Sequence, residues 1–171
     1  GRVVMTDHAA FVLINVYAPF NSRPARARFK KAFNAALTAR VQTLSAAGRQ
    51  IVLCGDLNAV SQALDSVKAP TEEELLASPW VQWIRELLAP RAMVLKGGVN
   101  GNKAGCTRDG AEEDQRLWAG RALLVDTFRV LHPKRPNAFT CWCNQTGARQ
   151  TNFGRRIDYI LASAGLCGIG G

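Results

Sequence analysis

The feature that most constrains the fold is a strand, helix, strand pattern in the first third of the chain. An apolar run rich in β-branched residues over 10–17 predicts a buried strand that ends before Pro19. A helix is predicted from Pro24 to Gly48, because apolar side chains recur there every three or four residues and glycine is a common C-terminal stop. The apolar run 50–54 predicts a second strand. Two strands joined by such a helix favour a layered α/β fold over an all-helical one.

The rest of the chain carries weaker structural signals. A capping box at 71–74 predicts the start of a helix, and Ser78-Pro79 predicts a second start that leads into an apolar helix face. Residues 96–114 are polar and rich in glycine, which predicts a long surface loop. Further strands are predicted over 138–143 and 157–161.

The composition indicates a folded domain, and the charge distribution suggests which kind of molecule it could bind. The chain has 171 residues, of which 47% are hydrophobic and 20% charged, so it can bury a core as one domain or as part of a larger one. Its net charge of +9 is concentrated at the two ends, since residues 1–58 carry 8 basic and 2 acidic groups and residues 121–171 carry 7 and 2. A basic patch formed by the two ends would suit a polyanion such as nucleic acid. A solvated basic face accounts for the same charge equally well.

Several features argue against membrane, secreted and zinc-binding proteins. No apolar run is long enough to span a bilayer, so we expect no membrane partner. The N-terminus lacks a secretory signal and an initiator methionine, so we expect a processed, trimmed or partial chain. The five cysteines are scattered without a Cys-x-x-Cys pair, which predicts reduced thiols in an intracellular compartment.

The tetrapeptide Gly55-Asp56-Leu57-Asn58 follows a predicted buried strand and carries residues suited to catalysis. Residues two apart on a strand share a side, so the Asp56 carboxylate and the Asn58 amide would lie together. A carboxylate can take a proton or hold a metal ion, and an amide can bind both a phosphate and a metal. An ordinary turn also favours glycine, aspartate and asparagine, so the tetrapeptide alone does not decide between the two interpretations.

Asp158 lies between Ile157 and Tyr159 on another predicted buried strand. Because an unpaired buried carboxylate is costly, we expect Asp158 to have a partner. That partner is either a functional arginine or histidine, or a structural arginine, Arg149 or Arg156.

These two segments belong to a set of five motifs that occur in a fixed order along the chain. The set is Asn15-Val16-Tyr17-Ala18-Pro19, Gly55-Asp56-Leu57-Asn58, Val125-Asp126-Thr127-Phe128, Phe139-Thr140-Cys141-Trp142 and Arg155-Arg156-Ile157-Asp158-Tyr159. In this combination the chain resembles the endonuclease/exonuclease/phosphatase superfamily, in its exonuclease III-like branch. The opening Gly-Arg-x-x-x-Thr, and Gly147-Ala148-Arg149 before Asn152-Phe153-Gly154, are similar to the eukaryotic type 2 apurinic/apyrimidinic (AP) endonucleases within that branch.

The resemblance implies a four-layered α/β sandwich of two β-sheets flanked by helices, of which this chain would be a truncated central portion. Residues 1–163 would form a partial domain that lacks the N-terminal and C-terminal active-site strands, and residues 164–171 a disordered tail. The metal-binding glutamate of the family lies on a strand before the Asn-Val-Tyr strand, and we expect it to fall outside this chain. The Ser-Asp-His motif of the family, which supplies the catalytic histidine, does not follow Leu161.

The resemblance also implies Mg²⁺-dependent hydrolysis of DNA phosphodiesters in base-excision repair, at abasic sites or 3′ ends, with Mn²⁺ as a substitute. Tyr17 would contact the scissile phosphate, and Asp56 would activate the attacking water. Asn58 would hold the phosphate and share a metal ion with Asp56, and Asp158 would orient the catalytic histidine. The residues that would contact DNA are Arg23, Trp142, Arg149, Asn152, Arg155 and Ile157.

One departure from the family pattern concerns the pocket for a flipped-out abasic sugar. Cys141 and Arg155 stand where the main AP endonucleases place aromatic residues, with Ile157 as the third member. A less apolar, more cationic pocket favours exonuclease or 3′-end trimming over incision at abasic sites. The resemblance further implies residence in the nucleus, or also in the mitochondrion, and a sliding-clamp partner bound through regions absent from this chain. Two alternatives are a retroelement-type endonuclease of the same superfamily and a non-catalytic nucleic-acid-binding fragment.

Overall fold

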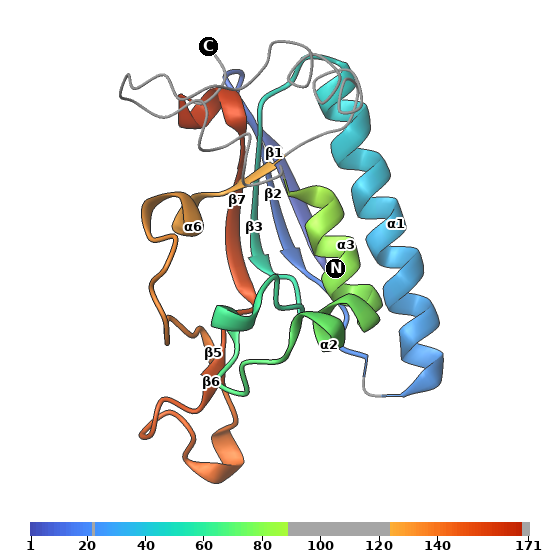
Figure 1. Cartoon of the computed structure of the whole chain (residues 1–171). Coiled ribbons are helices and arrows are strands. Elements are labelled where there is room, and N and C mark those ends of the chain that lie inside the picture. Colours follow the sequence, from blue (N-terminus) through green and yellow to red (C-terminus); the bar gives the residue numbers. More distant parts are fainter. Residues whose placement is uncertain (22, 89–123, 169–171) are drawn as a thin grey trace.

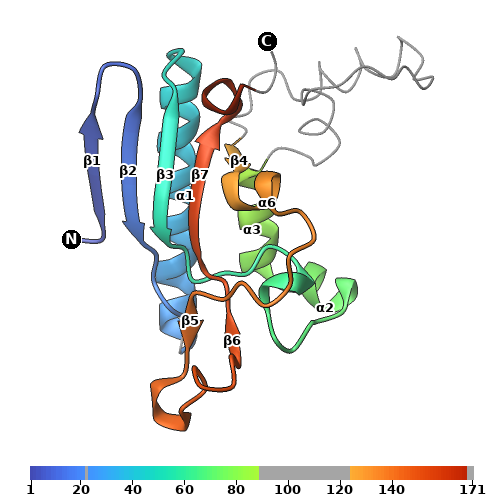
Figure 2. The same ribbon diagram turned by 90° about the vertical axis from the view of Figure 1, so that its left-hand side faces the viewer.

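The structure, a computed structural model, describes residues 1–21, 23–88 and 124–168. Its centre is a five-stranded sheet with the order β1-β2-β3-β7-β4, in which only β2 and β3 are parallel neighbours (Figure 1 and Figure 2). These strands span Val3–Asp7 (β1), Val12–Tyr17 (β2), Ile51–Asp56 (β3), Leu124–Asp126 (β4) and Asp158–Ser163 (β7). A second sheet of two strands pairs Cys141–Trp142 (β5) with Gly154–Arg155 (β6).

The connection from β2 to β3 is the long helix that the sequence pattern predicts. Helix α1 spans Pro24–Ala46, and its first residue is a proline, whose missing N–H would have no partner inside a helix at that position. The predicted capping box is formed at the start of α2, where Thr71 and Glu74 bond to each other's backbone N–H. The remaining elements are α2 (Glu72–Ala77), α3 (Pro79–Leu87), α6 (Thr127–Leu131) and the short 3₁₀ helices η1 (Ala63–Asp65), η2 (Asn144–Thr146) and η3 (Ala164–Cys167).

One face of the large sheet is buried beneath α1 and α3 (Figure 2). The indole N–H of Trp83 on α3 donates to Thr38 Oγ1 on α1 at 3.0 Å, which ties the two helices together. Each large side chain buried here contributes about 1.5–3 kcal/mol. The sheet residues of this core are the alternate positions Val12, Ile14, Val16, Ile51, Leu53, Tyr159 and Leu161, together with Leu124 on β4.

The opposite face of the sheet carries the other alternate positions and is more exposed. Ile160, in the middle of β7, is 58% exposed, and Val52 on β3 is only half-buried. Tyr17, Asp56 and Asp158 occupy the same alternate positions, so their side chains lie on this accessible face.

The predicted α/β fold of two sheets flanked by helices is confirmed. In the part of the chain that the structure describes, the second sheet is only the β5–β6 ribbon, so one helical layer and one large sheet of the expected sandwich are seen. None of the described helices combines the length and the apolar character that crossing a membrane requires.

The secondary structure differs most from the sequence predictions in three places. Strand β1 was not predicted, because all five of its residues are exposed and an edge strand of this kind has no apolar alternation. The strand predicted over 138–143 is reduced to Cys141–Trp142. The disordered tail expected from residue 164 begins instead with η3, Ala164–Cys167. The loop predicted over 96–114 lies outside the described residues.

Candidate active site

Three residues from separate sequence motifs meet at one end of the large sheet. Tyr17 at the end of β2 is the register partner of Asp56 at the end of β3, and Asp56 is in turn the partner of Asp158 at the start of β7. Side chains on register partners point to the same face, with Cα atoms about 4.5–5.5 Å apart across an antiparallel pair. The sheet therefore brings a phenol and two carboxylates together, as the assignment of these residues to one site requires.

Gly55 is the reason that β3 can end in this way. Its backbone has φ +115°, and a Cβ at this position would lie 2.2 Å from the carbonyl oxygen of Val16. Real side chains do not approach a backbone oxygen so closely, and the conformation is itself strained for any residue other than glycine. Gly55 thus allows β2 and β3 to stay paired up to Tyr17 and Asp56.

Asn58 contacts Asp56 through a turn rather than through strand alternation. The strand ends at Asp56, and Asn58 has a left-handed backbone with φ 49°. Its backbone N–H donates to Asp56 Oδ1 at 2.7 Å, and its side-chain Nδ2 donates to Asp56 Oδ2 at 3.2 Å and to the carbonyl of Ala18 at 2.8 Å. The two Nδ2 hydrogens are both engaged, so Oδ1 is the amide atom of Asn58 that is available to a further ligand.

The electrostatics of the site are those of a carboxylate pair with little compensation. Burial raises the pKa of Asp56, and the negative charge of Asp158 raises it further, whereas the Asn58 amide and the cation of Lys30 lower it. No salt bridge reaches either carboxylate among the described residues.

Uncompensated carboxylate and amide oxygens are what a hard divalent cation such as Mg²⁺ prefers. Asp56 and the Oδ1 of Asn58 fit such an ion, with the charge of Asp158 nearby. The described residues contain no group of three or more His, Cys, Asp or Glu side chains that could hold a metal ion together. Asp56 and Asn58 would therefore supply part of a coordination shell.

The expectation that Asp158 is buried is wrong, and so is the alternative of a structural ion pair with Arg149 or Arg156. Asp158 is half-exposed at the start of β7, and it lines a cavity of about 540 Å³ between α6 and β7. Its backbone N–H donates to Thr140 Oγ1 at 3.1 Å, but neither Arg149 nor Arg156 pairs with its carboxylate. Because Asp158 begins the strand on the accessible face, its carboxylate needs no buried partner.

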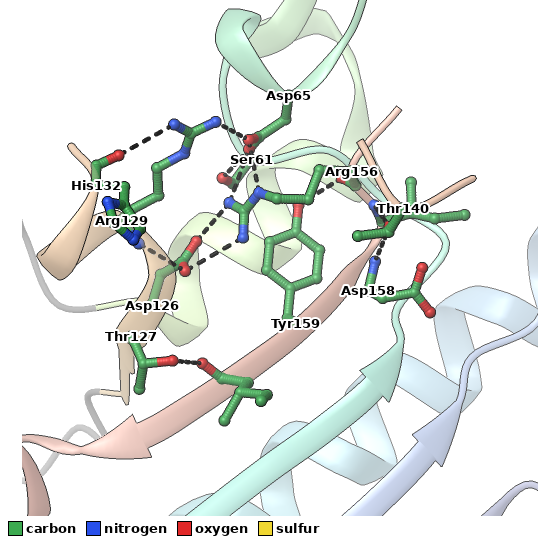
Figure 3. Close-up of polar contacts among 12 residues, drawn as sticks. Ser61, Asp65, Asp126, Thr127, Arg129, His132, Thr140, Arg156, Asp158 and Tyr159 are labelled. Carbon is green, nitrogen blue, oxygen red and sulfur yellow. Dashed lines mark hydrogen bonds and ion pairs between the residues drawn. The ribbon is translucent and has the colours of Figure 1, made fainter. Parts of the chain in front are cut away.

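Arg156 belongs instead to a buried ion network beside the site (Figure 3). Its guanidinium bonds Asp65 at 2.8 Å and Asp126 at 2.5 Å, and Arg129 bonds Asp65 at 2.5 Å. The ring of Tyr159 lies 4.4 Å from the Arg156 guanidinium carbon. The network holds η1, β4 and the chain leading into β7 together, so it fixes the position from which Asp158 emerges.

Sequence reasoning assigned no role to Asp65, Asp126 or Arg129. The residues of the network lie in three separate segments, and no spacing in the sequence connects them. The one available signal was the Val-Asp-Thr-Phe motif, in which Asp126 also caps α6 through the backbone N–H of Arg129.

Three of the predicted DNA-contacting residues form one cluster on the β5–β6 hairpin. The Arg149 guanidinium lies 5.1 Å from the ring centre of Trp142, and the Trp142 indole N–H donates to Asn152 Oδ1 at 3.0 Å. Asn152 in turn donates to the carbonyl of Asn137 at 3.0 Å, and its backbone is left-handed with φ 51°. The hairpin therefore presents the exposed cation of Arg149 beside the half-buried ring of Trp142, and hydrogen bonds through Asn152 connect that ring to the neighbouring chain.

The other predicted contacts lie around this cluster. Arg155 on β6 is exposed and is the register partner of Cys141, while Ile157 is half-buried. Burial raises the pKa of the Cys141 thiol, and the negative charges of Asp56 and Asp158 raise it further. Cys141 directly follows Thr140, whose Oγ1 accepts a hydrogen bond from the Asp158 backbone N–H. Arg23 is the residue before α1, whose N-terminal end lies at the same end of the molecule as the hairpin (Figure 1).

Comparison with known proteins identifies the family of the chain. The model of the Endonuclease/Exonuclease/phosphatase family matches residues 1–170. DNA-(apurinic or apyrimidinic site) endonuclease 2 of Xenopus laevis is 33% identical over 97% of this chain and 32% of its own length. The protein of the same name from Schizosaccharomyces pombe is 34% identical over 97% of this chain and 27% of its own length. The chain thus spans about a third or less of these relatives.

Solved structures give the same result for the fold. The crystal structure of the Xenopus laevis APE2 catalytic domain superposes with a TM-score of 0.69 and 29% identity, covering 98% of this chain and 45% of that one. The structure of the 3′ phosphatase NExo from Neisseria, bound to product DNA hairpin, has a TM-score of 0.65 at 22% identity, covering 96% and 52%. The resemblance to type 2 AP endonucleases is confirmed.

Proposed function

Because the chain belongs to the endonuclease/exonuclease/phosphatase family and is similar to AP endonuclease 2 proteins, we propose that it is the core of a metal-dependent DNA repair nuclease. The observation that carries this proposal is the alignment of Tyr17, Asp56 and Asp158 on three adjacent strands, with Asn58 bonded to Asp56. The reaction is hydrolysis of a DNA phosphodiester.

Each residue of the site has a chemical task that fits its surroundings. Asp56, once ionised, accepts a proton from the attacking water. Tyr17 is 54% exposed and donates its hydroxyl to a non-bridging phosphate oxygen, with the Arg2 guanidinium 4.9 Å from its ring centre adding positive charge nearby. Asp158 orients a general acid or base supplied beyond the described residues.

A divalent cation at Asp56 and Asn58 Oδ1 would stabilise the negative charge that gathers on the phosphate in the transition state. Mg²⁺ is the ion we propose, with Mn²⁺ as a substitute, because the donors are carboxylate and amide oxygens. Asn58 was also expected to hold the phosphate. With both Nδ2 hydrogens engaged by Ala18 and Asp56, Asn58 acts first as an oxygen ligand and as the support of Asp56.

The β5–β6 hairpin supplies the surface that holds DNA. Trp142 offers a ring on which a base or sugar can stack, and Arg149 and Arg155 offer cations for backbone phosphates. Cys141 and Arg155 are paired across the ribbon beside the two carboxylates, which makes the pocket for a flipped-out sugar polar. We therefore propose 3′-end processing and exonuclease activity as the main reaction, with weaker incision at abasic sites. Nuclear residence belongs to the same proposal through the similarity to eukaryotic AP endonucleases.

One observation favours a second function. Because the described residues hold no group of three metal-binding side chains, the chain would bind DNA without cutting it if two oxygen donors do not retain the ion.

A cleavage assay distinguishes the nuclease from the non-catalytic DNA-binding protein. The chain is incubated with end-labelled duplexes, one carrying an abasic site and one a mismatched 3′ end, with and without Mg²⁺. An Asp56→Ala variant controls for contaminating nucleases.

Metal-dependent trimming of the mismatched end, lost in Asp56→Ala, is the result expected of a nuclease core. Salt-sensitive binding of both duplexes without any cleavage would instead assign the chain the non-catalytic role.

A further inference from the structure

Lys30 on α1 is the largest fully buried side chain of the described residues, with no exposed surface. Lysine is almost never buried in this way unless its ammonium group has partners. Its Nζ donates to the backbone carbonyl of Asn58 at 2.6 Å and lies 5.0 Å from the ring centre of Trp80. The partners of Lys30 thus include the residue that holds Asp56.

Burial of this ammonium group is unfavourable for the fold. Desolvation lowers the pKa of Lys30 to about 8, although the negative charge of Asp56 opposes the change. An apolar side chain of similar length would fill the same space under Trp80 without this cost. Packing alone therefore gives no reason for a lysine at this position, and the reason must lie in what its ammonium group contacts.

The contacts form a chain of three residues that ends at the catalytic carboxylate. Lys30 holds the carbonyl oxygen of Asn58, whose left-handed backbone, with φ 49°, turns its N–H toward Asp56. The backbone and side-chain amides of Asn58 both donate to the Asp56 carboxylate, at 2.7 Å and 3.2 Å. The hydrogen bond that holds Asn58 comes from Lys30 on α1, and α1 covers the buried face of the sheet. Asp56 lies on the opposite, accessible face.

We propose that Lys30 is a positioning residue for the Asp56–Asn58 turn, which it holds from the buried side so that the Asp56 carboxylate and Asn58 Oδ1 keep the geometry needed to bind a cation. The proposal rests on the proposed function for its catalytic meaning. Lys30 itself touches no substrate, because its whole surface is covered by protein.

The test compares Lys30→Met with the conservative Lys30→Arg and with Lys31→Met, a control at the adjacent exposed lysine. Hydrogen–deuterium exchange of residues 56–59 and thermal unfolding are measured on every chain, and kcat and KM for 3′-end trimming on those that cleave. We expect exchange in Lys30→Met to rise by about 10-fold in residues 56–59 and to stay unchanged in the rest of the sheet, with no loss of melting temperature. We expect kcat to fall on the order of 10- to 100-fold with KM for DNA unchanged. Lys30→Arg should keep part of the wild-type protection from exchange at residues 56–59 and part of the wild-type kcat.

Two results would overturn the proposal. One is a folded Lys30→Met with wild-type exchange at residues 56–59. The other is exchange that rises throughout the sheet with a much lower melting temperature in both Lys30 variants, which would make Lys30 an ordinary structural residue. If the wild-type chain cleaves no DNA, the proposed function fails for this chain, but the exchange of residues 56–59 still decides the role of Lys30.

Discussion

Asp56 on β3 and Asp158 on β7 are register partners, so two carboxylates face each other across neighbouring strands at the accessible end of the sheet. Like charges in directly opposite positions destabilise a sheet. The described residues place no salt-bridged cation on either group, and the charge of Asp158 raises the pKa of Asp56. Two opposed carboxylates lower the stability of the sheet, and their presence is explained if the site binds a cation or a proton.

Asp56→Asn should stabilise the protein while abolishing its activity. The substitution removes one of two opposed charges, so the free energy of unfolding should rise by about 0.2–1 kcal/mol. Trimming of 3′ ends should fall on the order of 10³-fold, because the amide cannot accept a proton from water. Denaturant unfolding and single-turnover kinetics measure the two quantities. A variant that is both less stable and fully active would show that Asp56 is only structural.

Gly55→Ala should be far more damaging than the same change at another glycine with positive φ. At Gly55 the added Cβ would lie 2.2 Å from the Val16 carbonyl, whereas at Gly48, with φ +72°, nothing lies within 4 Å. Gly48→Ala is therefore the matched control, with a loss of about 1–2 kcal/mol from backbone strain alone. We expect Gly55→Ala to lose at least about 3 kcal/mol, the upper end of the cost of strain alone. Equal losses in thermal unfolding would contradict the role given to Gly55.

The buried network should make stability fall at acid pH through Asp65. Burial raises the pKa of Asp65, but hydrogen bonds and charges from Arg156 and Arg129 outweigh it and hold the pKa below its ordinary value of 3.8. Because the folded protein then binds this proton less readily than the unfolded chain, the stability from Asp65 is complete above pH 3.8 and is lost as pH falls below it.

The corresponding variant is Asp65→Asn. It should cost about 3–5 kcal/mol at neutral pH, because Arg156 and Arg129 lose a buried charge partner. It should also flatten the fall in stability at acid pH, measured by urea unfolding across a pH series. Glu73→Gln, at an exposed carboxylate on α2, controls for the loss of one acidic group. An unchanged acid limb in Asp65→Asn would show that other carboxylates govern acid unfolding.

DNA binding should depend on the hairpin in two separable ways. Arg149→Ala should reduce the slope of log affinity against log salt by about 1, as expected for the loss of one phosphate contact. Trp142→Ala should weaken binding by about 1–3 kcal/mol with little change in the slope, since it removes a stacking surface. Fluorescence anisotropy over a salt series measures both. Arg40→Ala, in the C-terminal half of α1, should change neither, and a loss there as large as that of Arg149 would place the DNA elsewhere.

The sequence predicted those parts of the fold and site in which local pattern and tertiary structure agree. In the C-terminal half of α1 the apolar spacing coincides with the buried face, at Leu37 and Val41, whereas in the N-terminal half Phe29 is exposed and Lys30 is buried instead. Gly55-Asp56-Leu57-Asn58 lies where a strand leaves the core. The edge strand Val3–Asp7 left no such signal, because neither of its faces is buried.

The partners of buried charges could not be predicted either. A structural ion pair of Asp158 with Arg149 or Arg156 was one of the alternatives, but Arg156 pairs with Asp65 and Asp126, which are 91 and 30 residues away. A lysine in a helix is ordinarily expected to face solvent. Lys30 is buried because the turn at Asn58 packs against it and accepts a hydrogen bond from its ammonium group. Pairings of this kind depend on how distant segments pack, and no spacing in the sequence records them.

The most direct test of the account is the binding of Mn²⁺ to the chain, measured by isothermal titration calorimetry in wild type, Asp56→Ala and the control Glu73→Gln. The account predicts that Mn²⁺ binds to the wild type and to Glu73→Gln with the same affinity, and that binding is lost in Asp56→Ala. Equal binding by all three chains, or binding by none of them, would contradict the claim that Asp56 and Asn58 form the cation site of a nuclease core.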